Sequence, residues 1–116
     1  MSVKIPEIPV FFYRTAGGGE PVLNWLRELP PGDRRAIGID LATVQFGWPI
    51  GMPICRSLGG GLWEVRSTLP SRRIARLVFF VGGGRIGVVH GFIKQTQKTP
   101  IDDLEIARKR AKEMKK

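Results

Sequence analysis

The sequence predicts an α+β domain: a small, mostly antiparallel twisted sheet with two N-terminal helices packed on one face and a C-terminal helix. Two patterns predict this fold class. Segments 62–66, 75–81 and 85–93 are strand-like and are separated by turn sequences. Apolar residues recur at helical spacing in two segments before these strands and in one segment after them. The length of 116 residues and the apolar fraction of 42% favour a single domain, expected to span residues 1–116.

The first part of the chain is expected to form one strand and two helices. The strand begins near Val10, because the prolines before it suit only the edge of a sheet. Pro21 suits the first position of a helix whose apolar residues are Val22, Trp25, Leu26 and Leu29. After a turn at 30–32, Asp33 is expected to cap a second helix. The inward-facing residues of this second helix are expected to be Ile37, Leu41, Val44 and Phe46.

The second part begins with a loop at 47–53 and continues with strands. Segment 75–81 is nearly all apolar, which is typical of a central strand covered on both faces. The glycines at 82–84 suit a hairpin connection to the strand at 85–93.

A final helix is expected after the last strand. Thr99 is expected to cap it, with Pro100 at its first position. Acidic side chains near its start and basic side chains near its end match the helix dipole. Its apolar stripe consists of Ile101, Leu104, Ala107, Ala111 and Met114. The order of elements favours helices on one face of the sheet.

The positive charge is concentrated in the second half of the chain. The net charge is +9, and residues 56–116 hold fourteen basic side chains against five acidic ones. A field of one sign attracts polyanions such as RNA, DNA, ribosomes, anionic lipid or an acidic protein, and a well-solvated basic surface without a specific partner is the alternative.

Other features limit the class of protein. The single cysteine allows no internal disulfide, and one cysteine with one histidine is too few for an ordinary zinc site. We therefore expect no metal and no cofactor. The apolar runs are too short to cross a bilayer, and residues 1–10 lack the apolar core of a signal peptide, so we expect a cytoplasmic protein without membrane contacts.

Basic residues at the strand ends are the candidate site. Arg66 ends one strand, Arg76 begins the next, and Lys94 and Lys98 join the last strand to the last helix. Neighbouring antiparallel strands would bring these cations to one edge, where they suit a phosphodiester and the charge that builds up when an RNA 2′-OH attacks it. We predict these four as catalytic residues, and Arg72, Arg73, Gln95 and Gln97 as RNA contacts. The residue types alone slightly favour the alternative that these cations only bind phosphate or lie at the edge of the sheet without a catalytic role.

The proton acceptor is harder to assign. Arginine is too strong a conjugate acid to act as a base, whereas a lysine beside other cations would have a lowered pKa. His90 alternates in phase with Val88 and Phe92, which favours a hydrogen-bonded core histidine over a base.

The segments SLGGGLWEVR, ARLVFF and GRIGVVHGFIKQTQKTPIDDLEIARKR resemble the RelE/ParE superfamily of bacterial toxins. The likeness is greatest to the phage-derived branch of HigB-type toxins, and it extends more loosely over residues 9–114. In relatives a tyrosine or a second histidine often stands in the site, but here the one tyrosine, Tyr13, lies on the first strand. The general base is therefore left open.

The resemblance implies a RelE-like sheet and a type II toxin that cleaves mRNA without a metal ion, in most relatives in the ribosomal A site. It also implies a helix-turn-helix antitoxin of the HigA type as partner, and it supports functional roles for Arg66 and Arg76. Two alternatives stay open: a ParE-like gyrase poison, and a basic nucleic-acid-binding module without enzymatic activity.

Overall fold

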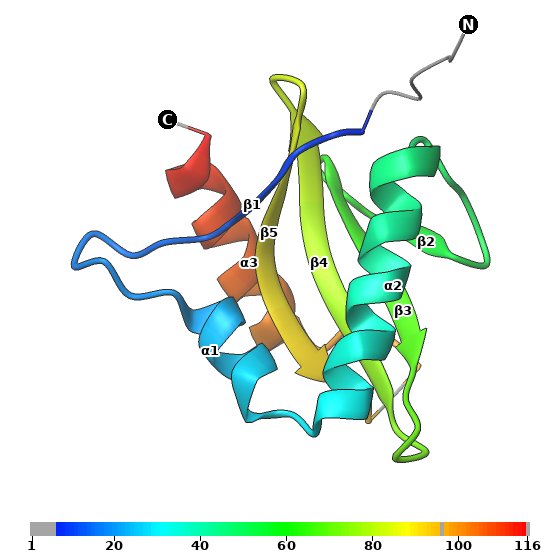
Figure 1. The fold of residues 1–116 in the computed structure, drawn as a ribbon. Helices are drawn as coiled ribbons and strands as arrows, with labels where there is room; N and C mark the ends of the chain where they lie inside the picture. The colour runs from blue at the N-terminus through cyan, green and yellow to red at the C-terminus, as the bar shows by residue number, and fades with distance from the viewer. Residues whose placement is uncertain (1–6, 96, 116) are drawn as a thin grey trace, which may run out of the picture.

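The computed structural model describes residues 7–95 and 97–115. They form one five-stranded sheet with strand order β1-β5-β4-β3-β2, in which β1 pairs with β5 in parallel and all other pairs are antiparallel (Figure 1). The strands are β1 (Val10–Phe12), β2 (Cys55–Gly59), β3 (Leu62–Thr68), β4 (Ile74–Gly82) and β5 (Arg85–Ile93). The helices are α1 (Pro21–Glu28), α2 (Pro31–Gly47) and α3 (Ile101–Met114). The predicted α+β class is confirmed.

One face of the sheet is covered by the two N-terminal helices. Val22 of α1 and Ile37 of α2 belong to a buried cluster that also contains Leu77 and Phe79 of the central strand β4. Gly91 of β5 allows α1 to approach closely, because a Cβ there would lie 2.5 Å from the Trp25 ring.

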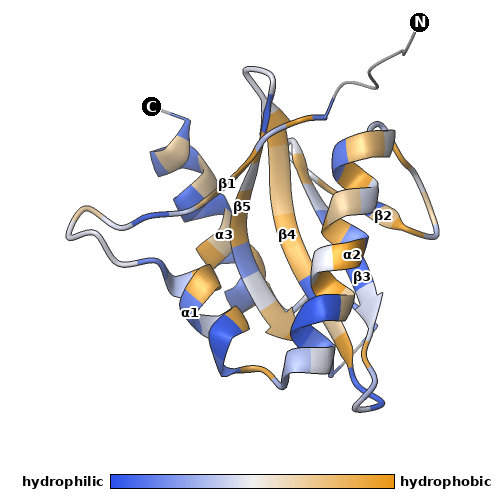
Figure 2. Cartoon of the chain, viewed as in Figure 1, coloured by the Kyte–Doolittle hydropathy of each residue, from blue (hydrophilic) through white to orange (hydrophobic). Residues whose placement is uncertain are grey.

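The opposite face of the sheet is covered by α3. Ala107 and Ala111 of α3 pack with Val78 and Phe80 of β4 and with Val89 of β5. The expectation that the helices share one face is therefore wrong for α3. The physical reason lies in β4, whose side chains are apolar on both faces and need cover on both, as its colour in Figure 2 shows.

Several local expectations differ from the structure. Strand β2 was not predicted, because CRSLG has no clear alternation of apolar and polar residues. Phe46 is 54% exposed instead of facing the core. Neither Asp33 nor Thr99 caps a helix: α2 and α3 begin after Pro30 and Pro100, and both polar side chains have tertiary partners instead.

In the described parts of the chain, no helix is both long and apolar enough to span a membrane.

Candidate active site

The cations of the sheet gather on the face that carries α3. Because successive side chains of a strand alternate between faces, Glu64 and Arg66 share the face of Leu62, and Arg76 shares the face of Val78. Both Leu62 and Val78 pack with α3. The site residues lie further along the same strands.

Strand pairing brings these side chains close together. Arg66 lies directly opposite Arg76 in the β3–β4 pair, and Arg56 lies opposite Glu64 in the β2–β3 pair. Lys94 directly follows β5. Its backbone N–H donates a hydrogen bond of 2.7 Å to the carbonyl of Ile74, the first residue of β4. The predicted neighbourhood of Arg66, Arg76 and Lys94 is therefore present.

Two adjoining pockets hold the candidate residues. The smaller, of about 160 Å³, is lined by Arg56, Glu64, Arg66, Arg76 and Gln97 together with residues 52–54. The larger, of about 470 Å³, is lined by Arg72, Arg73, Ile74, Lys94, Gln95 and Gln97. Gln97 lines both pockets, so the strand-end arginines and the predicted RNA contacts form one continuous surface. Lys98 is exposed directly after Gln97.

Arg76 is the most buried of these cations. Its side chain is 5% exposed, and its Nη1 lies 3.2 Å from Oε1 of Glu64, whose side chain is 3% exposed. Its Nη2 donates to the carbonyl of Gln97 at 3.1 Å. Neither Nε nor Nη1 makes a hydrogen bond to any residue that the structure describes. Nη1 keeps its ion pair with Glu64, so only Nε has neither a hydrogen bond nor an ion pair to a described residue. A guanidinium in the wall of a pocket is suited to an anionic ligand.

Glu64 was not among the predicted site residues. Its Oε2 accepts a hydrogen bond of 2.8 Å from Thr99 Oγ1, which fastens the segment between β5 and α3 to the sheet. The spacing of Glu64 and Arg66, two residues apart in one strand, was a signal that they share a face. Arg56 was also missed, because its strand β2 was not predicted.

Lys94 is half-buried at the edge of the larger pocket. Burial lowers its pKa, and the charges of Arg66, Arg76 and Arg56 lower it further, while Glu64 opposes the shift. Its Nζ lies 3.5 Å from Oε1 of Gln97. The expectation that clustered cations lower the pKa of a lysine is confirmed for Lys94, although its catalytic role stays a prediction.

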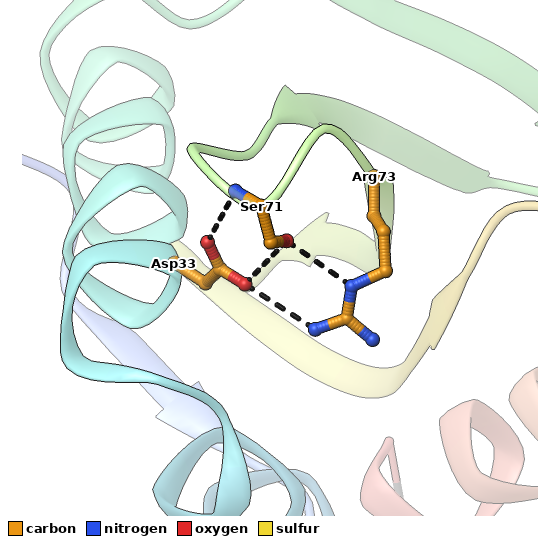
Figure 3. Close-up of polar contacts among 3 residues, drawn as sticks. All are labelled: Asp33, Ser71 and Arg73. Atoms are coloured by element: carbon orange, nitrogen blue, oxygen red, sulfur yellow. Dashed lines mark hydrogen bonds and ion pairs between the residues drawn. The ribbon is translucent and has the colours of Figure 1, made fainter.

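The loop with Arg72 and Arg73 is anchored to α2. Asp33, which is 1% exposed, accepts hydrogen bonds from the Ser71 hydroxyl at 2.7 Å and from Arg73 Nη2 at 3.3 Å (Figure 3). Hydrogen bonds from Ser71 lower the pKa of the Asp33 carboxyl, and Arg73 lowers it further. Arg73 therefore anchors this loop through Asp33 while its side chain stays 43% exposed. Arg72, with a φ of 67°, is also exposed at this turn.

His90 faces α3 rather than either pocket. Its Nε2 lies 2.7 Å from Oδ1 of Asp103, and its ring stacks on Phe92 with centroids 5.7 Å apart. The prediction of a hydrogen-bonded histidine is confirmed. The prediction that His90 and Val88 lie on the same face of β5 is wrong. An irregularity in the β4–β5 pairing places Val88 in the core beneath α1 and α2, on the opposite face from His90.

Metal and thiol chemistry find little support in the described residues. Those residues contain no group of three His, Cys, Asp or Glu side chains placed to hold a metal ion. Cys55 is buried, and burial raises its pKa to about 11, so its thiol stays protonated at neutral pH.

A comparison of the sequence with known protein families identifies the family of this chain. A family model described as phage derived protein Gp49-like (DUF891) matches residues 24–112, a stretch that contains both pockets. No match was found among the curated proteins. Since the match covers well over half of the 116 residues, the chain belongs to the Gp49-like family, a family of RelE/ParE-like toxins that is associated with toxin–antitoxin systems.

Proposed function

We propose that this protein is a toxin that cleaves mRNA without a metal ion, by directing the RNA 2′-OH onto the adjacent phosphate. The observation that carries the proposal is the convergence of Arg56, Arg66 and Arg76 on one pocket, with the Arg76 guanidinium held in place by Glu64 and by the carbonyl of Gln97. Such a cluster suits the dianionic phosphorane better than the monoanionic phosphodiester. Its stabilisation therefore increases towards the transition state.

The remaining predicted residues have supporting roles in this proposal. Lys94, with its lowered pKa, serves in proton transfer at the edge of the cluster. Arg72, Arg73, Gln95, Gln97 and Lys98 hold the RNA strand along the larger pocket and the linker after it. Positioning matters as much as charge, because in-line attack by the 2′-OH needs a constrained backbone.

We further propose that the protein is of the HigB-like branch, that it cleaves mRNA in the ribosomal A site, and that it acts in the cytoplasm. A helix-turn-helix antitoxin of the HigA type would be its partner. Support comes from the segment HGFIKQTQKTP at 90–100, which lies within the longest stretch that resembles the RelE/ParE superfamily. Further support comes from the concentration of the +9 net charge in residues 56–116, which suits contact with ribosomal RNA.

The test is to add purified protein to mRNA with and without translating ribosomes and to map the new RNA ends. Cuts that appear only with ribosomes, in register with codons, support the A-site proposal. Arg66→Ala should lower the cleavage rate by about 10²-fold or more. Its control is Arg35→Ala, which removes another exposed arginine, from α2, and should leave the rate unchanged.

Three results would contradict parts of the proposal. Cuts that do not need ribosomes would mean a free ribonuclease. Undiminished cleavage by the Arg66 variant would mean that the site lies elsewhere. An absence of cuts from folded protein in both mixtures would reject RNA cleavage and favour a toxin that acts by binding, such as a gyrase poison.

A further inference from the structure

The attack of a 2′-OH on phosphorus needs a group that accepts its proton, and the cations of the site are poor candidates. Three of these cations, Arg56, Arg66 and Arg76, are arginines, and arginine is too strong a conjugate acid to act as a base in a protein. The pKa of Lys94 is lowered, but a lysine must lose its proton before it can act as a base. His90 is turned towards Asp103 on α3.

One carboxylate stands among these cations. Among the described residues that line the smaller pocket, Glu64 alone carries an acidic side chain. Its Oε1 faces Nη1 of Arg76 at 3.2 Å, and its Oε2 accepts the hydroxyl of Thr99 at 2.8 Å. The carboxylate is therefore held in one orientation beside the guanidinium donors that suit the phosphate.

We propose that Glu64 is the general base of RNA cleavage and that Lys94 is the general acid. This inference rests on the proposed function. A negative charge weakens the affinity of a pocket for phosphate, so a carboxylate in its wall needs a reason. One role of the carboxylate is to orient Arg76. A second role is to accept the proton of the 2′-OH, which the arginines of this pocket cannot do.

The proton balance of the step is complete. The proton of the 2′-OH passes to Glu64 as the bond between O2′ and phosphorus forms. The bond between phosphorus and O5′ then breaks, and O5′ takes a proton from the Lys94 ammonium. The products are a 2′,3′-cyclic phosphate and a free 5′-OH. Solvent returns a proton to Lys94 and removes one from Glu64 before the next turnover.

Cationic side chains surround Glu64. Arg56 of β2, Arg66 of β3 and Arg76 of β4 line its pocket, and Lys94 approaches from the end of β5. The charges of the three arginines also lower the pKa of Lys94, so the cluster that surrounds the carboxylate favours proton transfer from Lys94 as well.

The test compares two substrates placed in the A site of programmed ribosomes: ordinary RNA, and RNA in which the 5′ leaving oxygen of the cleaved bond is replaced by sulfur. A thiolate leaves without protonation, so the sulfur substrate needs a base but no acid. Glu64→Gln should lower single-turnover cleavage of both substrates by about 10²–10⁴-fold. Lys94→Ala should slow cleavage of the oxygen substrate and recover most of the rate on the sulfur substrate.

Two controls accompany these variants. Glu28→Gln removes an exposed carboxylate of α1 and should cleave like the unaltered protein. Binding to ribosomes carrying RNA with a 2′-deoxy residue at the cleaved position should be no weaker for Glu64→Gln than for the unaltered protein, because the change removes a negative charge from the pocket wall and keeps the arginines that would contact the phosphate.

The pH dependence of the unaltered protein tests the same idea without a variant, in case Glu64→Gln does not fold. On the sulfur substrate, a carboxylate base predicts a rate that reaches its plateau by neutral pH. A rate that keeps rising into the alkaline range would mean a lysine base and would overturn the proposal, as would full activity of folded Glu64→Gln. If the unaltered protein cleaves neither substrate, the proposed function itself fails.

Discussion

The ion pair between Arg76 and Glu64 should stabilise the fold as well as serve the site. Their side chains are 5% and 3% exposed, so removing one partner leaves the other charge buried without its counter-ion. Breaking a buried pair in this way costs about 3–5 kcal/mol. We therefore expect Arg76→Met, which keeps most of the side-chain volume, to lower the free energy of unfolding by that amount.

The double variant Arg76→Met with Glu64→Gln separates charge from packing. It removes both charges and keeps an oxygen that can accept the Thr99 hydroxyl. Replacing a buried pair with neutral groups of similar volume is often nearly neutral. The double variant should therefore be more stable than Arg76→Met alone, by up to about 3–5 kcal/mol, which is the cost of the unpaired charge.

Urea denaturation followed by tryptophan fluorescence measures these differences, since the chain has three tryptophans. At about 4 °C per kcal/mol for a domain of this size, Arg76→Met should also melt about 12–20 °C lower. Stability within 0.5 kcal/mol of the unaltered protein would show that the pair is not buried, and would refute this reasoning. The result also decides how cleavage by Arg76 variants is interpreted, because lost activity is informative only in a folded sample.

Three further predictions concern other parts of the molecule. The pKa of Asp33 is lowered in the folded state, so its contribution to stability is present above its usual pKa of about 3.9 and is lost as the pH falls through the lowered value. Asp33→Asn should accordingly destabilise at neutral pH and reduce the loss of stability in acid, as followed by urea denaturation at several pH values. Gly91→Ala should cost about 1–3 kcal/mol in thermal melts because its Cβ would lie 2.5 Å from the Trp25 ring, whereas Gly38→Ala, with open space around it, should stabilise α2 by about 0.5–1 kcal/mol. If Lys94 donates a proton, the alkaline limb of the pH–rate profile should lie below its usual pKa of about 10.5, and Lys94→Arg should remove that limb; an unchanged limb would exclude Lys94 as the acid.

Much of the fold followed from local patterns. The apolar run at 75–81 predicted a central strand buried on both faces, which is β4. Helical periodicity predicted all three helices, and turn glycines at 82–84 predicted the hairpin from β4 to β5. Arg66 and Arg76 were expected to meet because sequential strands usually pair, and they lie directly opposite each other.

Other features depended on contacts between distant segments. Thr99 is of a residue type that often caps helices, but its hydroxyl donates a hydrogen bond to Glu64, which lies 35 residues earlier in the chain. Asp33 likewise binds Ser71 and Arg73 instead of its own helix. When a side chain can form a hydrogen bond either within its own helix or with a distant segment, the bond that also satisfies a buried polar group is favoured. The local sequence does not show which distant residue that is.

By itself, the sequence determined the class of fold, the order of its elements other than β2, the basic second half and the proximity of Arg66 to Arg76, because these follow from periodicity, turn chemistry, strand order and charge along the chain. Only the tertiary structure decided that α3 covers the second face of the sheet, that His90 turns towards α3, and that Glu64 and Arg56 join Arg66 and Arg76 around one pocket. The physical reason is that strand register and one irregular pairing between β4 and β5 set which side chains share a face, and register depends on the partner strand as much as on the strand itself.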